Sequence, residues 1–518
     1  MRTSTKHRKE FEGMFTNFLG GLNKTMPPHA IEQNELIDAT NWFYRPDTGY
    51  ITTRPGLKKY TTVAAGGAVV GMFEYVKAGT AKTVLVTEES PQEAYYLDAD
   101  PKPVAITGNL TGVKRPAFAV LNELLGIATG GALQTWDQAG SLVTPASAPS
   151  LDFIADFSKG VQNGAVARIV GCGNATYRDR AFMSGINDLS LWTPFDTTES
   201  NPKYMDAGYK DGMDLIGVAP FMGFVLLFKK GPSSSKRSIY KANLSDDSQY
   251  WACPRYKQMH SALSPHLIAE IGDGLLAVDV EGPKLITPSQ QPTDNIPFAI
   301  SPASNKIAGE MARYMDTSGF IIVDPVKMIA MVKPTKNSET FYCMDLVHGR
   351  WTMFKFAVNI QSGAYIGGKM LFGADDGFVY EYDDDLFQDN GSAYPMTTET
   401  KWFNFFDLRK ELTKEKYLDV IGLKDGSLTM TVKRRGALLR TTDPLNFTEG
   451  WWDWDVVNAL APEDWTEDLE KTPLDTLFDD EVVDSDFVSF AVSVTQGRCS
   501  LSHLSGRVAE IGRGMDDN

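Results

Sequence analysis

The chain has 518 residues, a formal net charge of −16, and 42% apolar, 22% charged and 11% aromatic residues. This length exceeds one ordinary hydrophobic core and predicts two or three domains. The acidic balance excludes tight nucleic-acid binding driven by counterion release. The many Gly (45) and Pro (27) residues, with the aromatic residues, favour β-structure.

The first predicted element is a lead-in at residues 18–57. It opens on the pair Gly20 and Gly21, continues through a helix-like run from Glu32 to Phe43, and leaves as an extended piece that ends at Arg54, Pro55 and Gly56. It contains no nucleophile, metal-ligand set or phosphate loop. We therefore interpret it as a clamp or lead-in to the rest of the chain.

A degenerate repeat follows, between about residues 65 and 390. Each unit is a β-rich run, a Gly-containing turn and a second β-rich run. The units close at Asp98, Asp137, Asp196, Asn243, Thr287, Asp345 and Asp383. The steps between these positions are 39, 59, 47, 44, 58 and 38 residues. One four-stranded propeller blade needs about 40–50 residues. The spacing therefore predicts a β-propeller of six or seven blades, and a stack of β-sandwiches is the alternative.

Hairpin turns are predicted inside these units at residues 129–131, 281–283 and 375–377, where Gly lies between β-forming runs. After Asp385 the sequence DDDLFQDNGSAYPMTT is typical of a linker. Strand-like runs then follow. We expect hairpin turns at Asp425-Gly426 and at Gln496-Gly497, and hence a small antiparallel, sandwich-like β domain.

An acidic segment interrupts this last domain. From Asp453 to Asp486 it holds thirteen acidic residues and one Lys. Four tryptophans lie among or beside the acids: Trp451, Trp452, Trp454 and Trp465. Acidic runs are usually solvated, whereas Trp rings bury their faces. We predict a loop at residues 450–486 that packs on a partner or a neighbouring subunit. The alternative is a flexible surface insertion.

The sequence predicts no catalytic site and no metal-binding site. Cys172, Cys253, Cys343 and Cys499 lie far apart, which indicates free thiols rather than a zinc or disulfide site. No HExxH, GxSxG or GxxxxGK[ST] motif is present. The acids Asp375 and Asp376 are better explained by a turn than by glycosidase chemistry. We therefore expect a non-enzyme with no metal and no cofactor.

The sequence also predicts no targeting signal and no membrane-spanning segment. The basic N-terminus MRTSTKHRKEFEG lacks an apolar stretch, so it is not a secretory signal. The longest apolar runs, such as Phe221 to Phe228, are far shorter than a membrane span. These features predict synthesis and folding in a reducing cytoplasm.

The chain resembles the tail nozzle proteins of short-tailed bacteriophages, also called tail stabilisation or tail tubular B proteins. The resemblance starts in the lead-in, with the Gly-Gly pair, a run from Glu35 to Asn41 and Trp42, then Gly49 and the Arg-Pro-Gly sequence. Blade phrases such as AFMSGINDLSLWTPFD and MLFGADDGFVYEYD, and the C-terminal strands, extend it along most of the chain. The acidic Trp segment and the shorter length depart from the family.

The resemblance implies a virion protein that forms a homo-hexameric ring below the portal and adaptor rings. An antiparallel β platform would line an axial channel for passive contact with double-stranded DNA. A propeller would carry fibres or spikes, and a tail needle or plug is a further partner. The predicted domains are 1–62 (lead-in contributing to the platform), 63–390 (propeller) and 391–518 (platform). An ordinary helix–hairpin packed on its own domain is the alternative interpretation of the lead-in.

Within this interpretation we expect assembly or interface residues in the lead-in and in the acidic segment. They are Gly20, Gly21, Asn41, Trp42, Arg54, Trp451, Trp452, Trp454 and Trp465. Two other classes stay open. One is a propeller that binds a glycan or another receptor, and the other is a glycan-cleaving tail enzyme that uses Asp375 or Asp376.

Overall fold

The computed structural model describes fifteen ranges of the chain. They are 10–46, 50–121, 123–145, 148–159, 166–173, 180–183, 204–208, 210–243, 252–293, 296–403, 410–434, 437–441, 445–447, 472–473 and 488–510. Two compact units divide the chain. The platform unit is formed by residues 1–57, 340–357 and 383–518, and the propeller unit by residues 58–339 and 358–382. The propeller is thus an insertion in a unit built from both parts of the chain that flank it.

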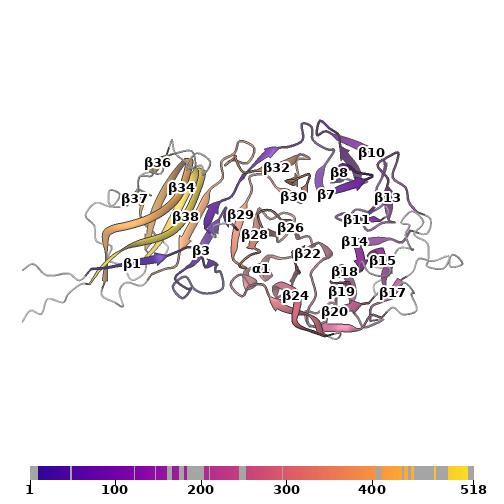
Figure 1. Cartoon of the computed structure of the whole chain (residues 1–518), viewed down its shortest axis with the longest axis horizontal. Helices are drawn as coiled ribbons and strands as arrows, with labels where there is room; N and C mark the ends of the chain where they lie inside the picture. Colours follow the sequence, from indigo (N-terminus) through magenta and orange to yellow (C-terminus); the bar gives the residue numbers. More distant parts are fainter. Residues whose placement is uncertain are drawn as a thin grey trace, which may run out of the picture. The chain divides into compact units, whose positions relative to one another are not determined.

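The propeller unit contains β-sheets that follow one another in chain order and are set in a ring, as Figure 1 shows. The first three sheets consist of β7 (Ala68–Lys77), β8 (Thr80–Glu88), β9 (Glu93–Leu97) and β10 (Pro103–Asn109); β11 (Ala117–Leu121), β12 (Leu124–Ala128) and β13 (Gln134–Trp136); and β14 (Leu151–Lys159), β15 (Val166–Gly173), β16 (Arg180–Met183) and β17 (Tyr204–Asp206). Consecutive strands within each sheet are antiparallel neighbours.

The next strands continue the ring. They are β18 (Asp214–Phe221), β19 (Phe224–Lys230), β20 (Arg237–Ala242) and β21 (Arg255–Gln258); β22 (Ile268–Ile271), β23 (Gly274–Asp279), β24 (Gly282–Thr293) and β25 (Ile296–Pro302); the hairpin β26 (Phe320–Asp324) and β27 (Ile329–Lys333); and β30 (Ile360–Ile366), β31 (Lys369–Ala374) and β32 (Val379–Asp383). A short 3-10 helix, η2 (Pro265–Leu267), precedes β22. Among the described residues the one α-helix is α1 (Ala308–Tyr314). The fold is an all-β, seven-bladed propeller, which settles the predicted six or seven blades.

The last sheet is completed by a strand from the end of the lead-in, which precedes the repeat region. β6 (Gly56–Lys59) lies beside β32 in the sheet β30–β31–β32–β6. The amide of Tyr60 donates to the carbonyl of Val379 over 2.8 Å, and Lys58 Nζ lies 3.6 Å from Glu381 Oε2. Early and late segments therefore share one blade and close the ring without a covalent link.

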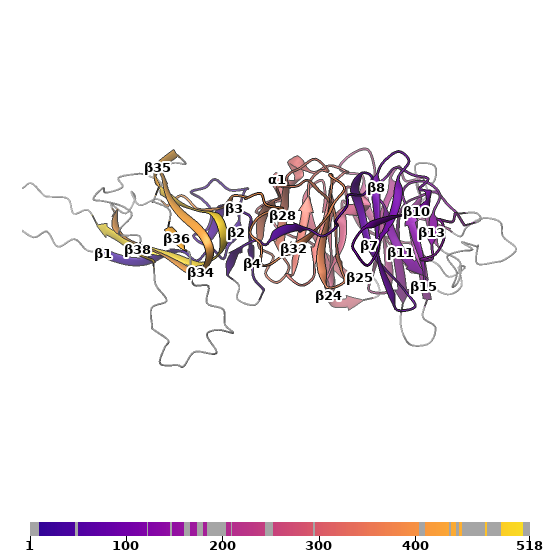
Figure 2. The same ribbon diagram turned by 90° about the horizontal axis from the view of Figure 1, so that it is seen from above.

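The core of this unit is divided into layers between neighbouring sheets. Figure 2 shows these sheets edge-on. Val84 and Ile127 belong to one buried cluster that joins the first two sheets, and Val69 and Leu371 to another that joins the last sheet to the first. Apolar residues face both sides of most strands, as in β19, where residues 225–228 are all buried. Continuous apolar runs are expected where both faces of a sheet are covered.

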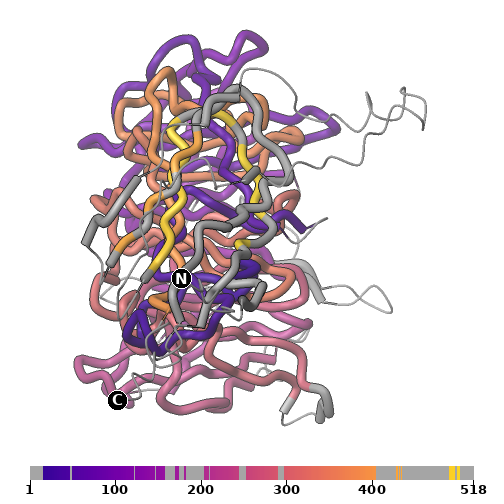
Figure 3. The backbone as a smooth tube through the Cα atoms, turned by 90° about the vertical axis from the view of Figure 1, so that its left-hand side faces the viewer, coloured from indigo at the N-terminus to yellow at the C-terminus, as the bar shows by residue number. Residues whose placement is uncertain are grey.

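The platform unit contains a largely antiparallel sheet. Its strands are β1 (Glu10–Thr16), β2 (Gly21–Leu22), β3 (Glu35–Thr40), β4 (Trp42–Tyr44), β5 (Ile51–Thr53), β28 (Thr340–Asp345), β29 (Trp351–Lys355), β33 (Met396–Thr400), β34 (Lys410–Arg434), β35 (Ala437–Thr441), β36 (Leu445–Phe447), β37 (Thr472–Pro473) and β38 (Val488–Glu510). β38 pairs with β1, β5, β33 and β34. Figure 3 shows its yellow tube beside the orange one of β33.

The helix-like run predicted from Glu32 to Phe43 is wrong: it forms β3 and β4. β3 pairs with β33 on one side and with β2 and β29 on the other, so both edges of its backbone are hydrogen-bonded. Asn41 then adopts φ 63°, which ends regular structure. Pairing with strands from distant parts of the sequence overrides the local helix signal.

The hairpin turns predicted at Asp425-Gly426 and Gln496-Gly497 are also wrong. β34 and β38 run straight through both dipeptides. Lys424 pairs with Arg498 and Ser427 with Gln496. Two residues of β34 therefore face one residue of β38, which is a β-bulge. Gly497 has φ 85° there, so the glycine serves the bulge instead of a turn.

The other hairpin predictions are confirmed. Residues 129–131 lie between β12 and β13, and residues 375–377 lie between β31 and β32. The hairpin predicted at 281–283 also forms, but its turn is at residues 280–281, because Gly282 and Pro283 already pair with β23 as part of β24. Gly377 has φ 80°, a conformation that glycine adopts without strain. These turns were readable because Gly and Asp act locally, within one hairpin.

Candidate functional site

The lead-in glycines lie at close backbone approaches within the platform unit. The Gly20 amide donates to the Asn34 carbonyl over 2.7 Å, and a Cβ at Gly20 would lie 2.6 Å from that oxygen. Gly21 has φ 75°, and a Cβ there would lie 3.1 Å from the backbone nitrogen of Trp351. Both positions therefore need a residue without a side chain.

Asn41 and Arg54, predicted from sequence as assembly residues, lie together in the interior of this unit. Neither side chain is exposed. Arg54 Nε donates to Asn41 Oδ1 over 2.9 Å, and the same oxygen accepts from the Lys355 amide over 2.7 Å. Asn41 Nδ2 donates to the Pro395 carbonyl over 2.6 Å. Asn41 thus connects three separate segments of the chain.

Arg54 uses all five of its N–H donors. Besides the bond to Asn41, Nη1 donates to Asp389 Oδ1 and to the Pro55 carbonyl, and Nη2 donates to Asp389 Oδ2 and to the Lys355 carbonyl, over 2.6–2.9 Å. The guanidinium also lies 3.6 Å from the ring centroid of Tyr394 and 4.3 Å from that of Phe356. A buried ion pair is tolerated when every donor is satisfied in this way. We call these five residues, Asn41, Arg54, Phe356, Asp389 and Tyr394, the Arg54 cluster.

Trp42 is fully buried in β4 beside this cluster in sequence, and its Nε1 has no hydrogen-bond partner. Trp451, Trp452, Trp454 and Trp465 lie outside the described residues, as does nearly all of the predicted acidic loop 450–486. The subunit-interface role of all nine residues stays a prediction. In this chain the five lead-in positions make contacts within their own unit.

Sequence reasoning missed Asp389, Tyr394 and Phe356. Asp389 and Tyr394 lie in the stretch interpreted as a linker, and Phe356 follows the sixth repeat. A single acid in a polar stretch carries no local sign of a partner more than three hundred residues away. The Arg-Pro-Gly sequence indicated Arg54, but nothing in the sequence indicated its partner Asp389.

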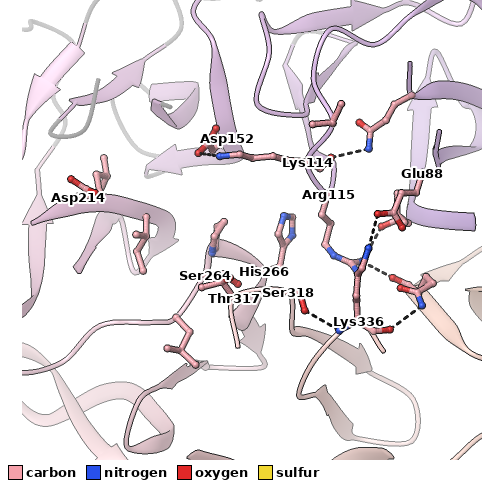
Figure 4. Close-up of a pocket in the computed structure, with 18 of the residues that line it drawn as sticks. Glu88, Lys114, Arg115, Asp152, Asp214, Ser264, His266, Thr317, Ser318 and Lys336 are labelled. Atoms are coloured by element: carbon pink, nitrogen blue, oxygen red, sulfur yellow. Dashed lines mark hydrogen bonds and ion pairs between the residues drawn. The ribbon is translucent and has the colours of Figure 1, made fainter. Parts of the chain in front are cut away.

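A cavity of about 470 Å³ lies in the propeller unit, and residues from all seven blades line it. The volume is within the roughly 300–1,000 Å³ of small-molecule sites. Figure 4 shows charged and polar side chains around it, among them Lys114, Arg115, Asp152, His266 and Lys336. Its lining contains no Trp, Tyr or Phe. Sequence reasoning did not find it, because each blade contributes only one to four residues.

Arg115 lines this cavity and contacts residues of several blades. It precedes β11, and its Nη1 donates to the carbonyls of Val70 in β7 and Gln361 in β30, over 2.9 and 2.5 Å. Its guanidinium carbon lies 4.0 Å from the ring centroid of Phe320 in β26. Burial lowers the pKa of Arg115 to about 10, against the opposing effect of Glu88. It therefore stays charged at neutral pH and joins four blades.

His266 in η2 lies beside Arg115 and is neutral. Burial, reinforced by the positive charge of Arg115, lowers the His266 pKa to about 3. Its ring packs edge-on against Phe153 with centroids 5.5 Å apart. Two ion pairs also line the cavity: Lys114 Nζ lies 2.5 Å from Asp152 Oδ2, and Lys336 Nζ lies 2.9 Å from Glu88 Oε1. The cavity thus carries both signs of charge.

The acids weighed as catalytic groups hold a turn. Asp376 accepts hydrogen bonds from the Phe378 amide over 3.1 Å and from the Tyr380 hydroxyl over 2.6 Å. Asp375 accepts one from Asn359 Nδ2 over 3.0 Å. Over the described ranges no group of three or more His, Cys, Asp or Glu is arranged to hold a metal ion. No helix in this part of the chain is long and apolar enough to cross a membrane.

Comparison with known proteins identifies no family. No family model and no curated protein matches the chain. Similar solved structures include the computationally designed Ika8 protein, with 9% identity, a TM-score of 0.35, and coverage of 71% of this chain and 99% of that one. BamB from Moraxella catarrhalis has 10% identity, a TM-score of 0.35, and coverage of 64% and 97%.

A third similar structure is BBS1N in complex with ARL6DN, with 7% identity, a TM-score of 0.39, and coverage of 67% of this chain and 98% of that one. Similarities this low say nothing about what the chain does.

Proposed function

We propose that this chain is a structural component of a short phage tail. It would form a homo-hexameric nozzle ring below the portal and adaptor, with the propeller available for fibres or spikes. The proposal rests on the resemblance of the lead-in, the repeats and the C-terminal strands to tail nozzle proteins. The chain would act through assembly and through passive contact with double-stranded DNA.

The observation that carries the proposal is the Arg54 cluster. Arg54 lies just before the propeller in the sequence and Asp389 just after it, and their side chains form a fully buried pair with two N–O contacts of 2.9 and 2.6 Å. The chain segments that enter and leave the propeller are therefore fixed to each other. A building block that carries an inserted domain needs such a fixed base, because loose connections would leave the insertion free to move.

The charge supports the same proposal. Each chain carries a formal charge of −16, and six copies would surround a channel with an excess of negative charge. DNA phosphates would find few Lys or Arg anchors on such a wall and would slide past it. An acidic protein is also simply soluble, so the charge supports the proposal without identifying it.

Electron microscopy of the purified protein, alone and mixed with tail-less capsids of the source phage, tests the proposal. We expect a six-fold ring at the portal vertex. A protein that stays monomeric with capsids, or that binds them without six-fold order, would contradict it. An unrelated propeller of similar size and charge is the control for non-specific attachment.

The glycan- or receptor-binding alternative keeps one supporting observation, the polar cavity of the propeller unit. That cavity lacks the aromatic rings that sugar faces stack on. The glycan-cleaving alternative has less support, because Asp375 and Asp376 are engaged in the turn between β31 and β32. An assay for glycan turnover by the wild type and by Asp376→Asn checks the latter directly.

A further inference from the structure

The propeller cavity contains buried polar atoms for which the chain supplies no partner. They are Gln92 Oε1, Asp152 Oδ1, Ser264 Oγ and Gln361 Oε1, and all four residues line the cavity. Gln92, Ser264 and Gln361 are 1%, 6% and 4% exposed. Buried polar groups normally have a partner, so four such atoms around one cavity indicate a ligand or ordered water.

The orientation of both amides is fixed by the chain itself. Gln92 Nε2 donates to the Lys114 carbonyl over 3.1 Å, and Gln361 Nε2 donates to the Lys336 carbonyl over 3.0 Å. A backbone carbonyl only accepts, so the end of each side chain that contacts it is the NH₂ group. Each Oε1 is therefore an acceptor left for something else.

Asp152 is divided in the same way. Its Oδ2 accepts from Lys114 Nζ, while Oδ1 is buried without a partner. The cavity thus offers three acceptor oxygens with fixed positions. The Ser264 hydroxyl adds a group that both donates and accepts.

Arg115 supplies donors on the same cavity. Its two hydrogen bonds to described residues both come from Nη1, which leaves the N–H groups of Nε and Nη2 without a bond to these residues. These N–H groups are thus available to an acceptor in the cavity. A group that offers several donors and several acceptors matches this lining.

Charge decides between candidate ligands. The ionisable groups around the cavity are Glu88, Asp152, Asp214, Lys114, Arg115 and Lys336, three acids and three bases, with a neutral His266. A charged ligand would disturb this balance in a partly desolvated place. A neutral ligand with several hydroxyl groups would fill both kinds of position, and Val70, Leu215 and Leu263 would contact its C–H groups.

We propose that this cavity binds a neutral polyol of monosaccharide size through hydrogen bonds, without aromatic stacking. The ligand hydroxyls donate to Gln92, Gln361 and Asp152 and accept from Arg115 and Ser264. This site does not depend on the proposed assembly role, because ring formation does not require a ligand in the cavity and ligand binding does not require a ring. Failure of one proposal therefore leaves the other standing.

Ligand-observed NMR on the full chain, with D-glucose and myo-inositol as probes, tests the proposal. We expect saturation transfer to both probes, and weaker transfer to glucuronate, whose charge opposes the balanced lining. Ser264→Ala removes one partner and should weaken binding roughly two- to tenfold, the effect of about 0.5–1.5 kcal/mol for one hydrogen bond. Gln361→Leu should weaken it further.

Ser261→Ala is the matched control. Ser261 Oγ is also buried without a partner, but Ser261 does not line the cavity. The Ser261→Ala variant should leave probe binding unchanged. Any general effect on folding from the loss of a buried hydroxyl should be the same as in Ser264→Ala. Equal loss in both serine variants would overturn the proposal, as would the absence of transfer to any neutral probe. A crystal structure from soaked crystals with only water beside Gln92 and Gln361 would overturn it too.

Discussion

Arg54 and Asp389 lie 335 positions apart and form a bidentate ion pair with no solvent exposure on either side chain. Breaking such a pair leaves a buried charge without a partner, which costs about 3–5 kcal/mol. We therefore expect Asp389→Asn to lower the free energy of unfolding of the platform unit by that amount, as measured by urea denaturation.

The matched control is Asp100→Asn, which removes the exposed pair of Asp100 with Lys102. The surface variant should leave the urea midpoint unchanged, because exposed pairs contribute little. Equal midpoints for the Asp389 and Asp100 variants would show that the buried pair does not hold the platform unit together.

The Gly56→Ala variant should also destabilise the platform unit. A Cβ at Gly56 would lie 2.3 Å from the Gln388 carbonyl oxygen, so the backbone has to shift, at about 1–3 kcal/mol. Gly309 in α1 is the control: a Cβ there meets nothing within 4 Å. Gly309→Ala should raise stability by roughly 0.5–1 kcal/mol. Thermal denaturation monitored by circular dichroism measures both, and a stable Gly56→Ala protein contradicts the close approach.

The four thiols should be unreactive in the folded chain. Burial raises the pKa of Cys172 and Cys253 to about 12 and raises those of Cys343 and Cys499 as well. The thiolate is the reactive form, so its fraction at pH 8 is negligible. We expect no rapid labelling by a disulfide reagent at pH 8 in the native state.

The same thiols report on each unit separately. Cys172 and Cys253 belong to the propeller unit, and Cys343 and Cys499 to the platform unit. When the urea concentration is raised, mass spectrometry should show that the two thiols of one unit become labelled at the same urea concentration. One member of a pair that labels far ahead of the other would contradict cooperative unfolding of that unit.

The pH dependence of stability should include a contribution from Lys333 in β27. Burial, followed by the positive charge of Arg115, lowers the Lys333 pKa from 10.5 to about 8. Between pH 8 and 10.5 the unfolded chain holds this proton and the folded chain releases it. Stability from this group therefore rises with pH across that window, by at most roughly 3 kcal/mol.

Comparison with Lys333→Met isolates this contribution, because other groups titrate equally in both proteins. The difference in unfolding free energy between wild type and variant should move in favour of the wild type from pH 8 to 10. A difference that stays constant over this range means that Lys333 keeps its ordinary pKa.

Deletion of residues 450–486 tests the predicted partner-binding segment. We expect a folded monomer, with the circular dichroism spectrum and thiol protection of the full chain, that does not join the tail. A second variant keeps the length and charge of the segment and replaces its four tryptophans by Ser. Normal tails with either variant would end the idea that this segment binds a partner.

The propeller could be predicted from sequence because its signals are local. Each blade repeats a hairpin with its own turn residues, such as Asp376 and Gly377, and the repeat length matches one blade. The number of blades could not be predicted from sequence alone. The seventh blade combines β32 with β6, and these two strands lie more than three hundred residues apart.

Other parts could not be predicted, since they depend on distant partners. Local propensity in residues 35–40 gives a helix, and the neighbours β33 and β29 make it a strand. The dipeptides Asp425-Gly426 and Gln496-Gly497 each predict a turn, and only their mutual pairing turns them into one bulge. Of the Arg54 cluster, sequence indicated Asn41 and Arg54. Of the propeller cavity, sequence indicated nothing.

The pairing of β5 with β38 has a consequence for biosynthesis. Thr52 donates from its hydroxyl to the carbonyl of Cys499, 447 positions later. At roughly 5–20 residues per second on the ribosome, β5 waits about 20 to 90 seconds for its partner strand to be translated. Through that interval the nascent chain exposes unpaired strand edges while the blades behind them fold. Chaperones in the producing cell would therefore meet this protein first as a finished propeller with an unfinished base.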